Sequence, residues 1–301
     1  MASLNNKQTP RDAIQRMASQ NKTNYMKNFV TRTISGAVYV ALISFSILFS
    51  SYSYLIFFSL ITGIALWEFY NLLEKNQNSQ INKPIATFGG IYLFASGFLF
   101  FNGLIQMKFF ALWFIIMLAI LILELFKKGD NAIRNISNTF LGQIYIALPL
   151  MFLSLLSLKD NFDGTMIYNP ILLMSFFSLI WIYDTGAYIF GITLGKHRLF
   201  ERISPKKSWE GAIGGAIMAL IASVGINYLF PGNLSLIQWL GFALITVVFG
   251  TFGDLVESMM KRYMNVKDSG QLIPGHGGIL DRIDSSLVAA PAVVIYYLYL
   301  T

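Results

Sequence analysis

Long apolar runs alternate along the chain with short polar segments. Crossing the hydrocarbon core of a bilayer as an α-helix takes about 20 mostly apolar residues. Nine runs approach that length, with cores near residues 34–51, 53–72, 85–103, 107–126, 139–158, 169–195, 209–230, 235–258 and 280–300. The pattern predicts an all-α integral membrane protein, a polytopic bundle of about nine transmembrane helices.

The polar and apolar segments also suggest how the chain is organised. Residues 1–28 are polar and mildly basic and lack the apolar run of a signal peptide, so we expect a cytoplasmic arm there. Residues 29–301 are expected to form a single membrane domain. Its spans over 34–158 are almost purely apolar, with acids only near their ends, and are interpreted as scaffold helices. Acids, glycines and basic pairs gather in 169–301, where we expect catalytic helices and cytoplasmic loops.

The basic residues provide a test of this number of spans. Cytoplasmic loops of membrane proteins carry an excess of lysine and arginine. If the N-terminus is inside, all 22 basic residues except Lys108 and Lys159 fall on one side of the membrane. The distribution therefore predicts a cytoplasmic N-terminus and a C-terminus on the opposite side.

Composition agrees with a membrane protein. Hydrophobic residues make up 55% of the 301 residues and charged residues 12%, against about 25% charged residues in soluble domains. This excludes a water-soluble globule. The net charge of +7 is ordinary for a protein with basic cytoplasmic loops, and no nucleic-acid partner is expected.

Asp184 is the first acid that does not fit an apolar helix. It lies well inside the span 169–195, where a charged residue costs about 2.5–3.5 kcal/mol on insertion scales. Two interpretations stay open. Asp184 either forms a hydrogen bond or ion pair between helices, or it lines a polar cavity that opens to the cytoplasm.

The loop before the span 209–230 has the features of an anion site. Ser204, Lys206 and Lys207 precede Ser208, which can cap a helix, and Glu210 would lie in its first turn. Free amide groups at a helix N-terminus and two ammonium groups suit a phosphate. Equally, the loop could bind anionic lipid headgroups.

Glycines recur at four-residue spacing around this loop. Gly191 and Gly195 precede it, and Gly211 and Gly215 follow it. Small residues at this spacing let helix backbones approach closely, so we expect tight helix packing here.

The stretch 250–285 concentrates charged residues at the ends of two spans. Residues at i, i+3, i+4 and i+7 share one face of a helix. The end of the span 235–258 has this spacing in Asp254, Glu257, Ser258 and Lys261, and the start of the next span in Asp281, Asp284 and Ser285. We expect the two acidic faces to meet at the inner edge of the membrane.

The hairpin between these two spans is basic and rich in glycine. It includes Lys261, Arg262, Lys267, His276, Gly277 and Gly278. Carboxylates from two helices offer oxygen ligands for Mg²⁺, and cations and backbone amides suit the phosphates that such a metal bridges. Simpler interpretations of single parts stay open, such as an ion pair of Asp284 with Arg262 or Arg282.

The residues that other common reaction types require are absent from the sequence. The chain has no cysteine and only two histidines, so a His/Cys zinc site has too few ligands. Neither the G-x-x-x-x-G-K-[ST] loop of P-loop ATPases nor a G-x-S-x-G nucleophile elbow is present. The reaction type that remains compatible with the residues is metal-assisted phosphoryl or nucleotidyl transfer in a cavity that faces the cytoplasm.

The segment 258–284 resembles the signature of a known enzyme family. Ser258-Met-Met-Lys261-Arg262, Lys267-Asp268-Ser-Gly270 and Pro274-Gly-His276-Gly277-Gly278-Ile-Leu-Asp281-Arg282-Ile-Asp284 follow one another at the spacing of the phosphatidate cytidylyltransferase (CDP-diacylglycerol synthase) family. Upstream blocks around Asp184, Ser204 to Gly211 and Gly253 to Ser258 are also similar to family blocks. The resemblance covers about residues 180–285, whereas the first half matches only in hydropathy.

The resemblance implies an activity and roles for individual residues. The reaction is CTP + phosphatidate → CDP-diacylglycerol + pyrophosphate, with Mg²⁺ and a monovalent cation such as K⁺. Asp254 and Asp281 would be the metal ligands, and Asp284 and Asp184 supporting acids. Lys206 and Lys207 would hold the triphosphate, and the hairpin from Lys261 to Gly278 would close over nucleotide or lipid phosphate.

Two other functions remain open at this point. One is a CTP-dependent transferase or kinase that acts on another lipid or on an isoprenoid. The other is an ion-coupled transporter whose buried acids bind Na⁺ or H⁺. The expected location is the bacterial cytoplasmic membrane, with the active site facing the cytoplasm, and the family and the glycine-rich faces are compatible with a homodimer.

Overall fold

The computed structural model describes residues 31, 33–77, 79–129, 131–160, 166–275 and 277–300. The cytoplasmic arm predicted for residues 1–28 lies outside this described part. The elements are, in chain order, a helix at Thr33–Phe49, α2 (Ser51–Gln77), α3 (Lys83–Phe101), η1 (Met107–Phe109), α4 (Phe110–Leu125), α5 (Ala132–Gly142), η2 (Gln143–Ala147), α6 (Leu148–Leu153), η3 (Ser154–Ser157), β1 (Leu158–Asp160), β2 (Met166–Tyr168), α7 (Ile171–Leu194), β3 (Arg198–Phe200), β4 (Ser204–Ser208), α8 (Trp209–Leu229), α9 (Leu236–Tyr263) and α10 (Leu280–Leu300).

Each predicted span corresponds to a helix in the described residues. Eight continuous helical stretches are long and apolar enough to cross a membrane, and the helix Thr33–Phe49 is a shorter apolar one. One stretch, Ala132–Ser157, joins α5, η2, α6 and η3 into a single span. Of the about nine transmembrane helices predicted, the described residues thus contain nine helices, eight of which are long enough to span, and the protein is a multi-pass membrane protein. The largest boundary difference is at Ala132–Ser157, which begins seven residues before the predicted 139, and α9 extends to Tyr263 rather than to residue 258.

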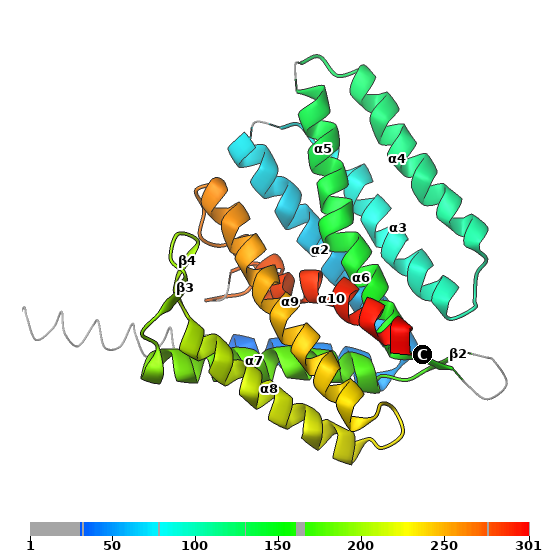
Figure 1. Ribbon diagram of the computed structural model, residues 1–301. Coiled ribbons are helices and arrows are strands. Elements are labelled where there is room, and N and C mark those ends of the chain that lie inside the picture. The colour runs from blue at the N-terminus through cyan, green and yellow to red at the C-terminus, as the bar shows by residue number, and fades with distance from the viewer. Residues whose placement is uncertain are drawn as a thin grey trace, which may run out of the picture.

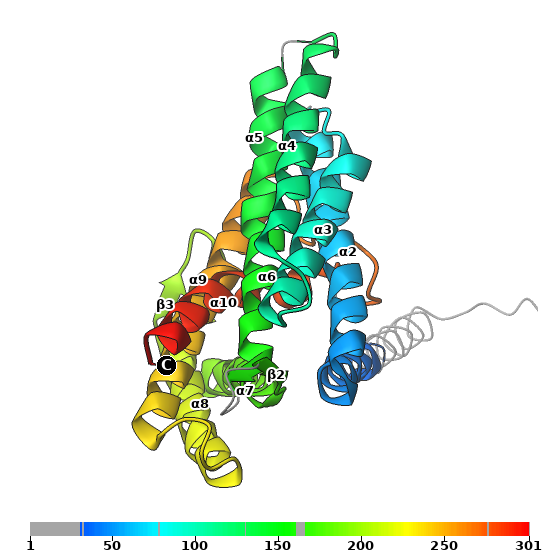
Figure 2. The same ribbon diagram turned by 90° about the vertical axis from the view of Figure 1, so that its right-hand side faces the viewer.

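The first two helices are joined by a sharp turn at Ser50. Ser50 N–H donates to Ser53 Oγ at 2.9 Å, and Ser53 N–H donates to Ser50 Oγ at 3.1 Å. This reciprocal pair satisfies backbone donors at the start of α2 that have no partner within the helix. In Figure 2 the helix Thr33–Phe49 (dark blue) lies at the N-terminal end of α2 and runs across its axis rather than along it.

The helices form two groups that meet at α9 and α10 (Figure 1). α2 to α6 lie together, α7 and α8 form a closely packed pair, and α10 packs against α9, α6 and α2. Aromatic side chains fill the contact between the groups, where Tyr54, Phe58 and Phe94 from the first half and Phe177 of α7 are buried in one cluster. The helices of the first half thus pack directly against those of the second half.

Glycines bring α7 and α8 into backbone contact, as the four-residue spacing predicted. A Cβ atom added to Gly215 would lie 2.6 Å from the carbonyl oxygen of Tyr183, and one added to Gly211 would lie 2.7 Å from that of Ala187. Neither position can hold a larger residue without separating the helices. The α7–α8 contact therefore fixes the acid on α7 relative to the start of α8.

Two short antiparallel hairpins qualify the all-α prediction. β1 pairs with β2 and β3 pairs with β4. Hydropathy over a window of about 20 residues cannot detect strands of three to five residues. The β3–β4 hairpin matters for function because β4 carries Lys206 and Lys207.

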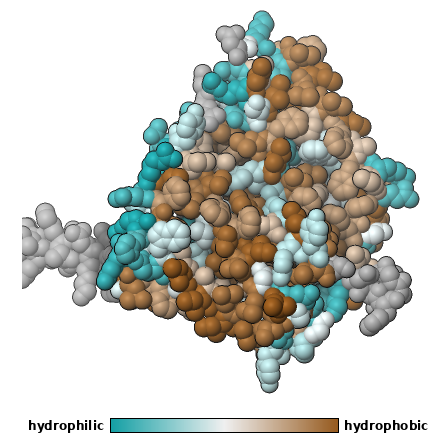
Figure 3. Space-filling view, in the orientation of Figure 1, coloured by the Kyte–Doolittle hydropathy of each residue, from teal (hydrophilic) through white to brown (hydrophobic). Residues whose placement is uncertain are grey.

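The surface agrees with a lipid environment. Large apolar side chains such as Phe49, Leu125, Ile133 and Tyr299 are mostly exposed in the described part of the chain. Figure 3 shows a broad hydrophobic face, with hydrophilic residues gathered at its margin, including the side where β3 and β4 lie. An apolar surface of this extent is typical of helices that face lipid.

Candidate functional site

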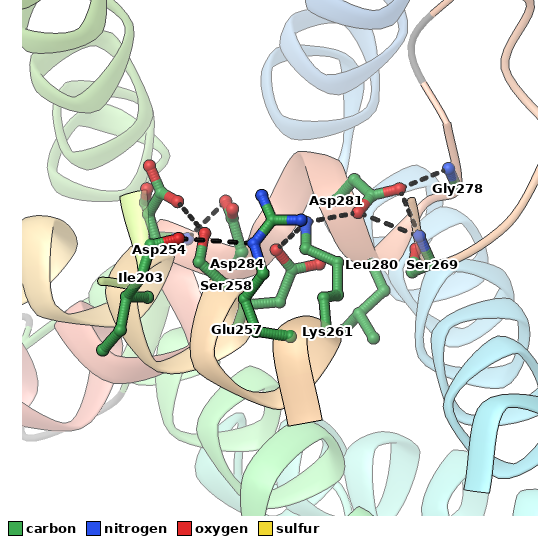
Figure 4. A network of polar contacts seen from close by, with 12 residues as sticks. Ile203, Asp254, Glu257, Ser258, Lys261, Ser269, Gly278, Leu280, Asp281 and Asp284 are labelled. Atoms are coloured by element: carbon green, nitrogen blue, oxygen red, sulfur yellow. Dashed lines mark hydrogen bonds and ion pairs between the residues drawn. The ribbon is translucent and has the colours of Figure 1, made fainter. Parts of the chain in front are cut away.

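Charged side chains of α9 and α10 meet in one network (Figure 4). Lys261 of α9 forms ion pairs with Glu257, one turn before it, and with Asp281 of α10, for which the Nζ to Oδ1 distance is 2.8 Å. Ser258 donates to Asp254 Oδ1 at 3.2 Å. The expectation that the acidic faces of these two helices meet is confirmed, and Lys261 links them.

Asp281 is held by the hairpin that precedes it. Its carboxylate accepts the backbone N–H groups of Ser269 at 2.9 Å and of Gly278 at 2.8 Å, in addition to the ammonium group of Lys261. The residue is only 8% exposed. A carboxylate offers about four lone-pair positions, so Asp281 is nearly saturated by donors from the protein itself.

Asp254 lies in a different environment. It forms an ion pair with Lys207 of β4, and both side chains are a little over a quarter exposed. They line a pocket of about 270 Å³ between α7, α8 and α9, together with Asp184, Lys206 and Ser208. Two lysines and two carboxylates thus face one cavity.

The start of α8 has the predicted capping arrangement. Ser208 is the N-cap residue, and its Oγ accepts the N–H of Gly211 at 3.2 Å. Glu210 in the first turn accepts the backbone N–H groups of Lys196 at 3.1 Å and His197 at 3.2 Å. These bonds fix the β3–β4 hairpin against the helix, so that Lys206 and Lys207 lie at the helix N-terminus.

Asp184 and Asp284 connect this pocket to the network of α9 and α10. Asp184 also lines a smaller cavity of about 90 Å³ with Asp281, Arg282 and Asp284. The charges of Asp254, Asp184 and Lys261 all act on Asp284. Among the described residues Asp284 has no ion pair, so the suggested pairing with Arg262 or Arg282 is not found. The acids at 184, 254, 281 and 284 are therefore neighbours around two adjoining cavities.

The remaining predicted residues are spread around this centre. Arg262 is exposed and donates to the carbonyl oxygen of Ile203 at 3.4 Å, close to Ser204. Lys267 is exposed on the α2 side of the hairpin, in another polar pocket. Gly277 adopts a positive φ of 82° in the hairpin turn. The residue before it, His276, lies outside the described residues.

Glu68 of α2 belongs to the site, although its position in the scaffold half concealed this. The side chain is 9% exposed, and its Oε2 accepts the N–H of Leu280 at 3.0 Å. Ser269 Oγ lies 3.5 Å from the same oxygen. The one available signal was an acid in an otherwise apolar span, which requires a polar partner.

Oxygen ligands for a metal are present, although they do not form a closed cage. No group of three or more His, Cys, Asp or Glu side chains lies at metal-binding spacing in the described part of the chain. Mg²⁺ needs no such cage, because proteins bind it through one or two carboxylates together with water and substrate phosphates. Asp254 has lone pairs beyond those used by Lys207 and Ser258. Its donor chemistry therefore fits a magnesium ion.

The fold and the site define a class: a multi-pass membrane protein with an acidic cavity bordered by lysines at a helix N-terminus. The model of the family described as "Cytidylyltransferase family" matches residues 30–300. This chain belongs to the cytidylyltransferase family.

Several bacterial relatives are named phosphatidate cytidylyltransferase. The chain is 50% identical to one from Staphylococcus aureus (strain COL) over 115 residues, which are 38% of this chain and 44% of the relative. It is 46% identical to one from Haemophilus influenzae over 132 residues, or 42% of this chain and 46% of the relative. The matched segment thus spans less than half the length of these curated relatives.

Proposed function

We propose that the protein is a CTP:phosphatidate cytidylyltransferase, which forms CDP-diacylglycerol and pyrophosphate for phospholipid synthesis. One observation carries the proposal beyond the family. The pocket between α7, α8 and α9 brings Lys206 and Lys207 against Asp184 and Asp254. Cations at a helix N-terminus suit a triphosphate, and adjacent carboxylates suit the metal that accompanies it.

The chemistry requires little beyond positioning and charge. A phosphate oxygen of phosphatidate attacks the α-phosphorus of CTP, the bond to the β-phosphate breaks, and pyrophosphate leaves with that electron pair. The nucleophile is already an anion, so no strong general base is needed. The barrier comes from repulsion between anions, which the ammonium groups of Lys206 and Lys207 offset while they hold the triphosphate.

The family also implies Mg²⁺, with Asp254 and Asp281 as ligands and Asp184 as a further candidate. When bound, the ion would neutralise phosphate charge and stabilise the leaving group. Asp254 fits this role as it stands. Asp281 would have to exchange one of its hydrogen bonds, most simply that from Lys261, whose ammonium group keeps Glu257 as a partner. Asp284 places a further carboxyl group in the cavity that Asp184 and Asp281 line.

The hairpin residues complete the proposed substrate site. Ser204, Lys261, Arg262, Lys267, Gly277 and Gly278, with His276 outside the described residues, are proposed to contact nucleotide or lipid phosphate. The distribution of basic residues supports a cytoplasmic N-terminus and an active site that faces the cytoplasm, where CTP is available. The acyl chains of phosphatidate would stay in the bilayer. K⁺ as a second cation and a homodimer remain part of this proposal on family resemblance.

The choice of lipid acceptor tests the proposal against its nearest alternatives. Purified protein in detergent is supplied with CTP and Mg²⁺ and with one acceptor: phosphatidate, diacylglycerol or an isoprenoid phosphate. Pyrophosphate release with phosphatidate alone is expected. Release of CDP with diacylglycerol would identify a kinase, and turnover of the isoprenoid phosphate another transferase. If the folded protein turns over none of them, the enzyme proposal fails and the transporter alternative gains support.

A further inference from the structure

Residues 264–279 form the hairpin that joins α9 to α10. Two carboxylates from different halves of the sequence hold the base of this hairpin. Asp281 of α10 accepts backbone N–H groups from Ser269 and Gly278, one on each arm of the hairpin. Glu68 of α2 accepts the N–H of Leu280 at 3.0 Å and lies 3.5 Å from Ser269 Oγ. Ser269 therefore contacts both acids, through its amide on one side and its hydroxyl on the other.

The hairpin backbone is shaped around the carboxylate of Glu68. A Cβ atom added to Gly270 would lie 2.6 Å from Glu68 Oε1, and one added to Gly278 would overlap Glu68 Oε2. The same Cβ on Gly270 would lie 3.2 Å from the Cα atom of Gly278. Two glycines on opposite arms thus pack against each other and against one acid from a distant helix.

The use of an acid at this position needs an explanation. Glu68 is buried in the same region as Asp281, and the negative charge of Asp281 acts unfavourably on it. Packing alone would be served at lower cost by an apolar residue. The carboxylate does something that an apolar residue cannot, because it accepts the N–H of Leu280 at the start of α10, directly before Asp281.

We propose that Glu68 is a positioning residue that fixes the hairpin and the start of α10, and so sets the orientation of Asp281 at the catalytic cavity. It touches no reacting atom and acts through Ser269, Gly278 and Leu280. The inference rests on the proposed function for its catalytic consequence, but its structural part stands independently. α2 is then part of the catalytic machinery rather than of the scaffold alone.

The structural part is tested by hydrogen exchange on the full-length protein in detergent. Glu68→Ala should increase amide exchange across residues 264–279, whereas Glu68→Gln, which keeps an acceptor oxygen, should stay close to the wild type. Glu124→Ala is the matched control, because Glu124 is also buried in a span but pairs with Lys127 and Asn135, away from the hairpin. Unchanged exchange in Glu68→Ala, or an equal increase in Glu124→Ala, would overturn the proposal whatever the enzyme does.

The catalytic part is tested with the acceptor that the wild type turns over. Outer-shell partners of a metal ligand are commonly worth about 10- to 100-fold in activity or metal affinity. We expect a loss of kcat in that range for Glu68→Ala with a higher Mg²⁺ concentration for half-maximal rate, and rescue by Glu68→Gln. An unchanged kcat and magnesium dependence would refute the positioning role. If the wild type itself is inactive, the proposed function fails, and the exchange experiment still decides the structural part.

A double-mutant cycle tests the contact itself. Gly270→Ala introduces a methyl group against Glu68, so alone it should increase exchange in the hairpin. In a Glu68→Ala background the two closest contacts of that methyl group are removed and only the 3.2 Å approach to the Cα atom of Gly278 is left, so the second substitution should add less than it does alone. Coupling between contacting residues is the expected result. Additive effects would show that the glycine and the acid do not act on each other.

Discussion

Lys207 of β4 and Asp254 of α9 form an ion pair across the pocket in which both are proposed to act. A proposed phosphate ligand and a proposed metal ligand therefore neutralise each other when no substrate is bound. When CTP and its metal bind, Lys207 would turn to the triphosphate, and Asp254 would bind the metal through the lone pairs that Lys207 and Ser258 leave free. The pair thus keeps the charged cavity compensated inside an apolar protein.

This relationship predicts that removing either partner affects turnover more than folding. Both side chains are more than a quarter exposed, and such pairs contribute about 0–1 kcal/mol to stability. Lys207→Gln should raise KM for CTP, and Asp254→Asn should abolish detectable turnover. Unfolding in detergent should be almost unchanged for both. A large loss of stability in both variants would instead indicate a structural pair.

Lys206 provides a second test of the phosphate site. It is exposed, lines the same pocket as Lys207, and has no ion pair among the residues that the structure describes. Lys206→Gln should raise KM for CTP without a change in stability. Steady-state kinetics at several salt concentrations check this, because a lost phosphate contact also weakens the dependence of binding on salt. An unchanged KM for CTP would exclude Lys206 from the phosphate site.

Asp281 and Asp284 should behave differently although they share a helix turn. Asp281→Asn removes the carboxylate that accepts from Lys261 and from two backbone N–H groups. A loss of about 1.5–3 kcal/mol in unfolding free energy is expected, as for hydrogen bonds to charged groups. Asp284→Asn replaces a buried carboxyl group that faces other acids with a neutral amide of the same size, so stability should stay equal or rise. Denaturation of both variants in detergent makes the comparison, and equal losses would contradict the described contacts.

The contact between α7 and α8 offers a prediction about packing. Gly215→Ala places a methyl group 2.6 Å from the carbonyl oxygen of Tyr183, and overpacking of this kind costs about 1–3 kcal/mol. Gly225→Ala in the same helix is the matched control, since its added Cβ would meet no atom within 4 Å. It should be neutral or slightly stabilising. The temperature of thermal unfolding should therefore fall for Gly215→Ala and stay equal or rise slightly for Gly225→Ala. An equal fall in both variants would contradict the described contact.

The sequence is most informative where hydrophobicity alone decides the structure. Each of the nine apolar runs corresponds to a helix in the described part of the chain. The i, i+3, i+4 spacing also correctly placed Asp254 beside Ser258 and Glu257 beside Lys261. The cap at Ser208 was also predictable, because Ser208 and the acid at position 210 form a local signal.

Contacts between distant segments could not be predicted in this way. Glu68 looks like a helix-end acid until α10 brings Leu280 to it. Asp281 is proposed as a metal ligand, but its hydrogen bonds from Ser269 and Gly278 depend on how the hairpin folds back onto α10. The strand that carries Lys207 is too short for any periodicity. In each case the tertiary fold determines which residue the side chain contacts.

The fate of the phosphates of CTP tests the central claim most directly. Purified protein is given phosphatidate, Mg²⁺ and CTP labelled in separate experiments at the α- or the γ-phosphate, and the lipid is then extracted. Label from the α-phosphate should enter the lipid and label from the γ-phosphate should appear as pyrophosphate, with neither transfer in Asp254→Asn. Entry of the γ-label into lipid, or no transfer by folded wild-type protein, would contradict the assignment as a phosphatidate cytidylyltransferase.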